Sequence, residues 1–117
     1  QRKIYIPMPD TEARRVVIKI HLRGAEMSGV SIDGIAQKTE YYSGRDIMNV
    51  CEEAVIGMVR ECNPKLQEME GKQLELYSIM TRPLVQADFD RALEKIKPSV
   101  SLDDLDKFRD WERSFGG

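Results

Sequence analysis

The chain has 117 residues, of which 41% are hydrophobic and 32% are charged, and its net charge is −2. This length and composition fit one domain with a modest core, and the small net charge gives no support for a general attraction to nucleic acid or to an anionic membrane. No apolar run approaches the roughly 20 residues that a transmembrane helix needs.

The first segment predicts a short strand. Residues 3–6 alternate in polarity and are rich in strand formers, and Pro7 and Pro9 end the segment. No apolar signal core is present at the N-terminus. The sequence also begins abruptly, and we expect it to be a piece cut from a longer protein.

A first helix is expected over about residues 11–22. Asp10 or Thr11 can cap it, and Gly24 can end it. Four of its apolar side chains are predicted to share one face: Ala13, Val16, Val17 and Ile20. After a loop, Ser31 is the expected N-cap of a short second helix that turns Ile32, Ile35 and Ala36 inward.

The longest helix is predicted to begin after Ser43. Asp46 stands three residues later and completes a capping box, with aspartate in place of the usual glutamate. Apolar or small side chains then follow in a single helical stripe: Ile47, Val50, Cys51, Ala54, Val55, Met58, Val59 and Cys62. Pro64 is expected to close the helix. The two cysteines would lie roughly 16 Å apart, so we expect reduced thiols in a cytosolic protein and not a disulfide.

The remainder predicts a polar, partly helical connector over residues 64–82, a helix over residues 86–96, and a final helix after Ser101. The helix over residues 86–96 is expected to turn Phe89, Ala92, Leu93 and Ile96 inward. The predicted fold class is all-α: a small helical bundle with a short N-terminal strand and an extra C-terminal helix.

No catalytic constellation is apparent. Residues 24–31 have the glycine spacing of a phosphate-binding loop, but Val30 occupies the lysine position, so this motif is rejected. With His21 as the only histidine and no CxxC pair, a structural zinc site is not expected. The chain by itself should therefore not be an enzyme.

Three stretches resemble the lid of AAA ATPases. The sequence KIYIPMPD, followed by ARR and IKIHL, looks like the last core strand of the large domain running into the first lid helix. Residues 39–47, TEYYSGRDI, are similar to the family pattern Glu-Gly-Tyr-Ser-Gly-Ala-Asp-Ile. Residues 88–116 contain the tail pattern of the microtubule-severing and membrane-remodelling branch. On these motifs the chain is identified as a lid of the katanin, spastin and fidgetin group, and its connector has katanin-like length.

This resemblance implies three parts: residues 1–9 end the large AAA domain, residues 10–100 form the lid, and residues 101–117 form a C-terminal helix. In this family the large domain holds the Walker motifs, the triphosphate and Mg²⁺. The lid covers the adenine and ribose of ATP and contacts the neighbouring subunit of a homo-hexamer. The parent protein would then be an ATP hydrolase that severs microtubules, located in the cytoplasm with the cytoskeleton.

The resemblance also implies site residues. Val17 and His21, one helical turn apart, match positions against the purine, and Gly44 and Arg45 match the pair beside the base and ribose. Arg45 stands where the family usually has alanine. Each residue also has an alternative role. Val17 could simply pack in the core, and His21 could be a histidine at the boundary of the core. Gly44 could ease a tight helix start, and Arg45 could be a solvated arginine.

Further expectations concern neighbouring positions. Tyr41 replaces the family's usual glycine and would be strained if its φ were positive. Asp46 is expected to be a capping residue and not a nucleotide contact. Trp111 and Phe115 are the expected interface residues, toward the large domain or an adjacent lid.

Two other functions are compatible with the sequence. The parent could disassemble protein complexes at membranes, or the chain could be a freestanding helical adaptor that binds a partner with its long helix. An upstream Gly-x4-Gly-Lys-Thr motif would separate the ATPase functions from the adaptor. A tubulin-severing assay would separate the two ATPases.

Overall fold

A computed structural model of the chain describes residues 8–71, 77–100, 110 and 113. Within these residues it contains four α-helices, which are α1 (Thr11–His21), α2 (Ile32–Lys38), α3 (Gly44–Cys62) and α5 (Gln86–Lys95), and the short 3-10 helix η1 (Leu66–Glu68). This confirms the predicted all-α class. The predicted N-terminal strand and most of the predicted C-terminal helix lie outside the described residues.

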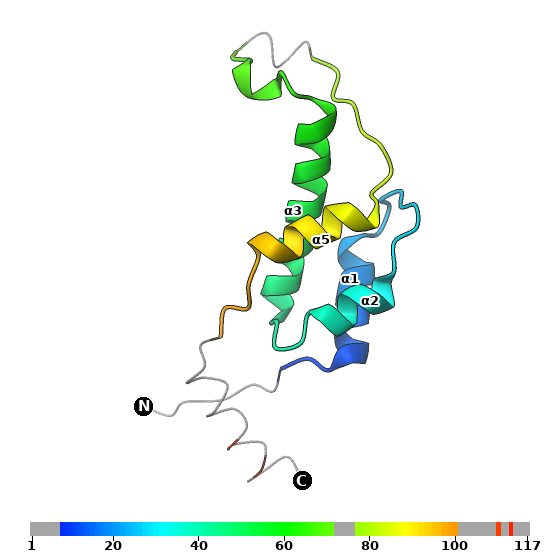
Figure 1. Cartoon of the computed structure of the whole chain (residues 1–117), viewed down its shortest axis with the longest axis vertical. Coiled ribbons are helices and arrows are strands. Elements are labelled where there is room, and N and C mark those ends of the chain that lie inside the picture. The colour runs from blue at the N-terminus through cyan, green and yellow to red at the C-terminus, as the bar shows by residue number, and fades with distance from the viewer. Residues whose placement is uncertain (1–7, 72–76, 101–109, 111–112, 114–117) are drawn as a thin grey trace.

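The longest helix, α3, forms the axis of the bundle (Figure 1). The helix α5 crosses α3 near its middle, α1 packs beside the N-terminal half of α3, and α2 packs on α1. The C-terminal turns of α3 extend beyond the other helices. Along the bundle, the first turn of α3 lies level with the start of α1 (Figure 1).

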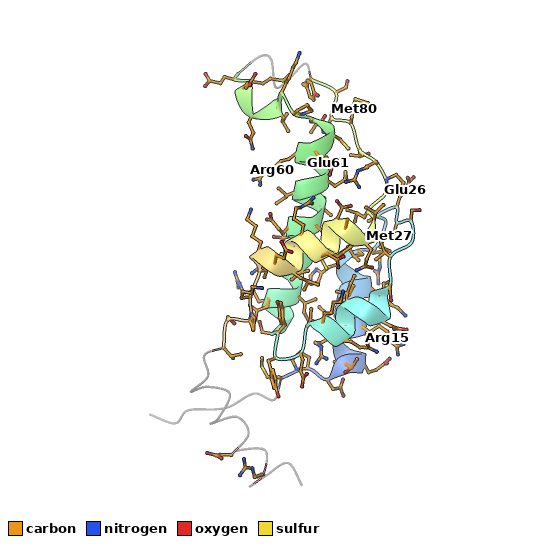
Figure 2. The ribbon with its side chains drawn as sticks, viewed as in Figure 1. Arg15, Glu26, Met27, Arg60, Glu61 and Met80 are labelled. Carbon is orange, nitrogen blue, oxygen red and sulfur yellow. The ribbon has the colours of Figure 1, made fainter. Side chains whose placement is uncertain are left out.

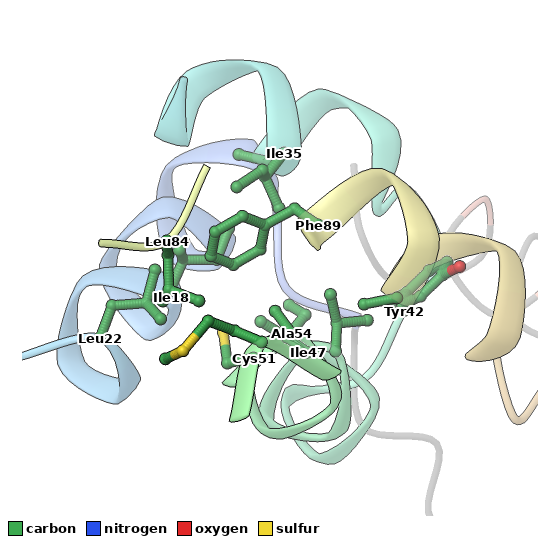
Figure 3. Close-up of a cluster of buried hydrophobic side chains, with 13 residues drawn as sticks. Ile18, Leu22, Ile35, Tyr42, Ile47, Cys51, Ala54, Leu84 and Phe89 are labelled. Atoms are coloured by element: carbon green, nitrogen blue, oxygen red, sulfur yellow. The ribbon is translucent and has the colours of Figure 1, made fainter. Parts of the chain in front are cut away.

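The core lies where the four helices meet (Figure 3). Its largest fully buried apolar side chains come from every helix and from the segment before α5: Ile18, Ile35, Ile47, Val50, Leu84 and Phe89. Phe89 is the largest of them and lies between side chains of α1 and α2. Burying an aromatic side chain of this size contributes roughly 3 kcal/mol, so Phe89 is a large contributor to the packing of α5. The inward positions predicted for α2, α3 and α5 are confirmed.

The helix starts are confirmed residue by residue. Asp10 caps α1 by accepting the Ala13 N–H at 2.8 Å, and Ser31 caps α2. At the start of α3 the Asp46 N–H donates to Ser43 Oγ, and the Ser43 N–H donates to Asp46 Oδ2, each at 3.0 Å. This reciprocal pair is the predicted capping box.

The buried face of α1 differs from the prediction. Arg14, Ile18 and Leu22 turn inward, whereas Val16 and Ile20 are 46% and 53% exposed. Positions four apart lie on one helix face, so these three residues form the buried face of α1, and one of them is an arginine. The prediction for Val16 and Ile20 was wrong because it took the stripe with the most apolar residues as the core stripe.

Arg14 is tolerated inside because each of its three guanidinium nitrogens donates to an acceptor within the chain. Nε donates to the Ala36 carbonyl at 2.9 Å, Nη1 donates to the Pro9 carbonyl at 2.8 Å, and Nη2 donates to Thr11 Oγ1 at 3.2 Å. The Ala36 carbonyl belongs to the last turn of α2, where the helix dipole favours a cation. Arg14 thus fixes both the segment before α1 and the end of α2.

Two loops are tied across the bundle. The Ser28 N–H donates to the Leu84 carbonyl at 2.8 Å, and the Leu84 N–H donates to the Glu26 carbonyl at 2.9 Å, which pairs the loop after α1 with the segment before α5. Asn63, 1% exposed, exchanges two hydrogen bonds with the backbone of Met80 at 2.8 and 2.9 Å. Figure 2 shows Met80 beside the C-terminal end of α3.

Both cysteines lie in α3 with free thiols, as predicted. Cys51 is buried, and this burial, together with the nearby Glu52 carboxylate, raises the pKa of its thiol to about 11. Cys62 is partly exposed. Cys51 therefore behaves as a small apolar core residue.

Candidate functional site

The first predicted pair lies in the second half of α1. Val17 is partly buried and packs against the core, whereas His21, in the last turn, is exposed. The exposed Val16 and Ile20 adjoin them on the same helix. The surface of α1 around His21 is therefore apolar and open.

The second predicted pair opens α3. Gly44 and Arg45 are both exposed, directly after the Ser43 cap. A Cβ placed on Gly44 would meet no atom within 4 Å, and its φ is not in the left-handed region. Nothing in the described part of the chain therefore requires glycine at this position. The Arg45 side chain likewise has no hydrogen-bond or ion-pair partner among the described residues.

The two pairs lie on adjacent helices but at different levels. In Figure 1 both α1 and α3 run upward, so the first turn of α3 lies level with the start of α1 and not with its last turn. The two residues of each pair therefore lie together on one helix, but the two pairs are displaced from each other along the axis of the bundle. Contact of all four residues with one nucleotide stays a prediction, as do the interface roles of Trp111 and Phe115, which lie outside the described residues.

Tyr41 has the strained backbone that the likeness to the family pattern suggested. Its φ is 68°, in the left-handed region where glycine is free of penalty and other residues are not. Among the described non-glycine residues it alone has a positive φ. The turn leading into α3 therefore keeps a glycine-type conformation with a tyrosine in it.

Asp46 is a capping residue, as expected, and it has a second role that the sequence did not reveal. Its Oδ2 also accepts the Ser99 N–H at 3.0 Å and the Ser99 hydroxyl at 3.1 Å. Burial raises the pKa of Asp46, but the hydrogen bonds from Ser99 and Ser43 outweigh it and hold the pKa below its usual value. The carboxylate is thus kept ionised at the junction of two chain segments.

A second buried carboxylate, that of Asp88 in α5, was also missed. The Arg82 guanidinium donates to its two oxygens at 2.8 and 2.9 Å, and the Val85 N–H donates at 2.9 Å. Arg82 holds the pKa of Asp88 below its usual value. Arg82 also donates to Glu61 of α3 at 2.9 Å. The only local signal was the position of Asp88 in the first turn of its helix.

An open groove of about 440 Å³ lies between α3 and α5. Its walls carry both charge signs, and it contains none of the four predicted site residues: it is lined by Glu53, Gly57, Arg60, Arg91, Glu94 and Lys95. The described residues include no group of three or more His, Cys, Asp or Glu side chains placed to hold a metal ion. Among the described helices, none is both long and apolar enough to cross a bilayer.

The sequence matches two family models. Residues 29–73 match the AAA+ lid domain, and residues 61–116 match the Vps4 C terminal oligomerisation domain. The A1 form of the katanin p60 ATPase-containing subunit from Arabidopsis thaliana is 41% identical, and the A-like 1 form from Homo sapiens is 38% identical. Each alignment covers 99% of this chain but only 22% and 24% of the respective relative. The chain thus spans less than a quarter of the length of these proteins.

Solved structures share the fold. A katanin structure described as the structural basis for katanin self-assembly superposes with a TM-score of 0.73 at 30% identity, over 92% of this chain and 38% of that one. The FIGL-1 AAA domain in complex with ADP gives a TM-score of 0.72 over 98% of this chain and 38% of that one, and at 24% identity it speaks for the fold alone.

The helical order, the capped start of α3 and the matches over residues 29–116 define the class: the chain belongs to the AAA ATPase lid family. Within that family, its relatives of 38–41% identity over the whole chain place it in the katanin group. The membership that the three sequence motifs predicted is confirmed.

Proposed function

We propose that this chain is the lid that covers the adenine and ribose of ATP in a katanin-like AAA ATPase. The first half of the proposal concerns the nucleotide. Val17 and His21 on α1, with Gly44 and Arg45 at the start of α3, are the residues that would lie against the purine and ribose. The triphosphate and Mg²⁺ would be held by the large domain of the parent protein.

The observation that carries the proposal is that nothing in the described chain accounts for a glycine at position 44. A helix start gains nothing from glycine over alanine unless a positive φ or a close neighbour demands it. At Gly44 neither demand comes from the described chain, because its φ is ordinary and a Cβ would point into open space. A flat group from outside the chain, approaching the backbone closely, supplies the missing reason. The Arg45 cation beside it, which has no partner among the described residues, is available to stack over a base or to reach toward phosphate.

The test measures binding of ATP to the full-length parent protein with Arg45→Ala and, as the matched control, Arg60→Ala. Both arginines are exposed on α3, but Arg60 lies near its opposite end. Arg45→Ala should change the affinity for ATP or the turnover, roughly tenfold if one charge-assisted contact is lost, whereas Arg60→Ala should leave both unchanged. An unchanged affinity and turnover for Arg45→Ala would reject the contact.

Gly44→Ala gives an independent test. In the isolated chain it should raise stability by up to about 1 kcal/mol, because alanine favours the helix more than glycine does. In the parent protein the added methyl group should weaken ATP binding. Gain of stability without loss of ATP affinity would show that nothing approaches this backbone. The isolated chain is expected to show no measurable ATPase activity, because it contains no phosphate-binding loop.

The second half of the proposal concerns the assembled enzyme. We infer that the parent forms a homo-hexamer and severs microtubules in the cytoplasm, as the katanin resemblance implies, with the lid touching the large domains of its own and the neighbouring subunit. The match of residues 61–116 to an oligomerisation domain supports self-assembly. Purified parent protein should cut taxol-stabilised microtubules in the presence of ATP. Intact microtubules, together with robust ATP hydrolysis, would instead favour the disassembly of another complex.

A further inference from the structure

Ser99 lies in the irregular segment that follows α5, and its side chain is exposed. Its hydroxyl donates to Asp46 Oδ2 at 3.1 Å, and its N–H donates to the same oxygen at 3.0 Å. Among the serine and threonine hydroxyls that the structure describes, this is the only one that donates to a carboxylate. An accessible hydroxyl group thus helps to fasten the segment after α5 to the start of α3.

The sequence around Ser99 is one that a protein kinase can bind. Lys95 and Lys97 stand four and two residues before it, and both are exposed, although Lys95 pairs with Glu53 at 2.9 Å. The helix α5 ends at Lys95, so residues 96–100 lie outside any helix. Kinases distinguish their substrates partly by charge pattern. An accessible serine that follows two lysines therefore fits a kinase whose substrate cleft is acidic.

Other hydroxyl groups of the described chain show why Ser99 differs. Thr39 is fully buried and donates to backbone carbonyls of α2, so a kinase cannot reach it. Ser28 and Thr81 are exposed, but no hydrogen bond of either side chain is found in the described part of the chain, so a phosphate on them would break no contact. Ser99 combines access from solvent with a contact that a phosphate would break.

Phosphoryl transfer to Ser99 is incompatible with its contact to Asp46. A bond forms between Ser99 Oγ and the γ-phosphorus of ATP, the bond from that phosphorus to the β,γ-bridging oxygen breaks, ADP leaves, and the hydroxyl proton passes to the general base of the kinase. The product Oγ has no hydrogen to donate. The phosphate carries a charge of about −1.5 to −2 at pH 7 and lies beside a carboxylate that is only 5% exposed, where water screens the repulsion poorly.

We propose that Ser99 is a phosphorylation site for a serine kinase that selects basic residues before its acceptor, and that phosphate on Ser99 releases residues 97–100 from the start of α3. The inference stands apart from the proposed function, because it involves no nucleotide contact of this chain.

Two remaining contacts keep the release local. Asp46 still accepts the Ser43 N–H at 3.0 Å and still completes the capping box, so α3 keeps its start. The Tyr42 hydroxyl still donates to the Ile96 carbonyl at 2.6 Å, so the end of α5 keeps its position. Only residues 97–100 are expected to separate from the bundle.

The first experiment tests whether a kinase uses the site. The full-length parent protein is incubated with ATP, Mg²⁺ and either cAMP-dependent protein kinase or protein kinase C, and mass spectrometry locates the phosphate. We expect phosphate on Ser99 with at least one of the two kinases. The double variant Lys95→Gln with Lys97→Gln should lower the rate of this modification roughly tenfold. Absence of phosphate from Ser99 in both reactions, or an unchanged rate in the double variant, would overturn the assignment.

The second experiment measures hydrogen exchange of the backbone amide at position 99 in the parent protein, resolved by mass spectrometry with electron-transfer fragmentation. Phosphorylation should lower the protection factor of this amide roughly tenfold or more, the factor that corresponds to one hydrogen bond to a charged group. Ser99→Ala is the matched control: it keeps the N–H bond to Asp46 and adds no charge, so its protection factor should stay close to that of the unmodified protein. Equal protection before and after phosphorylation would overturn the release.

A double-mutant cycle then tests whether Asp46 supplies the repulsion. Ser99→Glu should lower the protection factor of the amide at position 99 relative to Ser99→Ala. In the Asp46→Asn background this difference should shrink, because the negative charge that repels glutamate has been removed. A difference of the same size in both backgrounds would show that the release has another cause, and the proposed mechanism would be rejected.

Discussion

Replacement of Asp88 by asparagine tests whether one buried carboxylate holds the upper part of the bundle together. The Asp88 side chain is 1% exposed and is bound by both terminal nitrogens of Arg82 and by the Val85 N–H. Through Arg82 it is connected to Glu61 on α3. The substitution keeps the shape of the side chain and removes its charge, so the loss of stability reports on the ion pairs of Asp88 with Arg82, at 2.8 Å, and with Arg91, at 3.4 Å.

The expected loss in the free energy of unfolding depends on which hydrogen bonds asparagine can still accept. Its amide group offers donors to a guanidinium that only donates, so at least one buried oxygen contact is lost outright. Breaking a buried pair in this way costs about 3–5 kcal/mol when the partner stays dry. The Arg82 side chain is 29% exposed and can be hydrated again, which reduces the cost. We expect Asp88→Asn to lower the free energy of unfolding by about 2 kcal/mol, which at this chain length corresponds to a fall in Tm of roughly 8 °C.

The assay is urea unfolding of the chain followed by circular dichroism at 222 nm. Asp90→Asn is the matched control, because it makes the same change two residues later on α5. The Asp90 side chain is 51% exposed and its ion pair with Lys38 is 3.5 Å long, so this variant should lose less than about 0.5 kcal/mol. Equal unfolding free energies for the two variants would refute the reasoning, since burial is what distinguishes them.

Three further predictions concern single positions. Tyr41→Gly should be more stable to urea than Tyr41→Ala by about 1 kcal/mol, because only glycine relieves the positive φ, and an alanine variant of equal or greater stability would contradict this. At pH 8 a thiol reagent should modify Cys62 first, because a pKa of about 11 leaves roughly one Cys51 thiol in a thousand ionised, and faster labelling of Cys51 would argue against its burial. The lowered pKa values of Asp46 and Asp88 contribute stability that is present above the unfolded-state pKa of about 4 and is lost as the pH falls through the folded-state values. The free energy of unfolding, measured with urea at pH 7, 5, 4 and 3, should therefore change little from pH 7 to pH 5 and should fall below pH 4. Asp46→Asn should make this fall smaller. A fall at acid pH identical to that of the wild type would contradict the prediction.

The helix starts and three of the buried faces could be predicted from the sequence because they depend on neighbours. A cap such as Ser31 or the Ser43–Asp46 box is set by residues within one turn, and the stripes of α2, α3 and α5 are set by helical period alone. These features need no knowledge of what the helix packs against. The family motifs added the order of the elements and the membership in the katanin group.

The second partner of Asp46 could not be predicted, because Ser99 is fifty-three residues away and nothing local to either residue specifies the meeting. The same holds for Asp88, whose partner Arg82 stands in a segment without periodic structure. The proposed site residues are a different case. A nucleotide contact leaves no period in the sequence, so Val17, His21, Gly44 and Arg45 could be assigned only through the resemblance.

The error on α1 shows why counting apolar residues fails on a helix with two contact faces. One face, which contains Arg14 and Ile18, serves the core of this chain, and its arginine donates hydrogen bonds to carbonyl groups that only the folded structure brings within reach. The other face leaves Val16 46% and Ile20 53% exposed in the described chain. A helix that needed only its own core would carry polar residues there. The richer apolar stripe on the outside is thus what a lid requires if α1 must also pack against the large domain of the parent protein, and the residues that misled the core assignment are the ones that this proposed contact would bury.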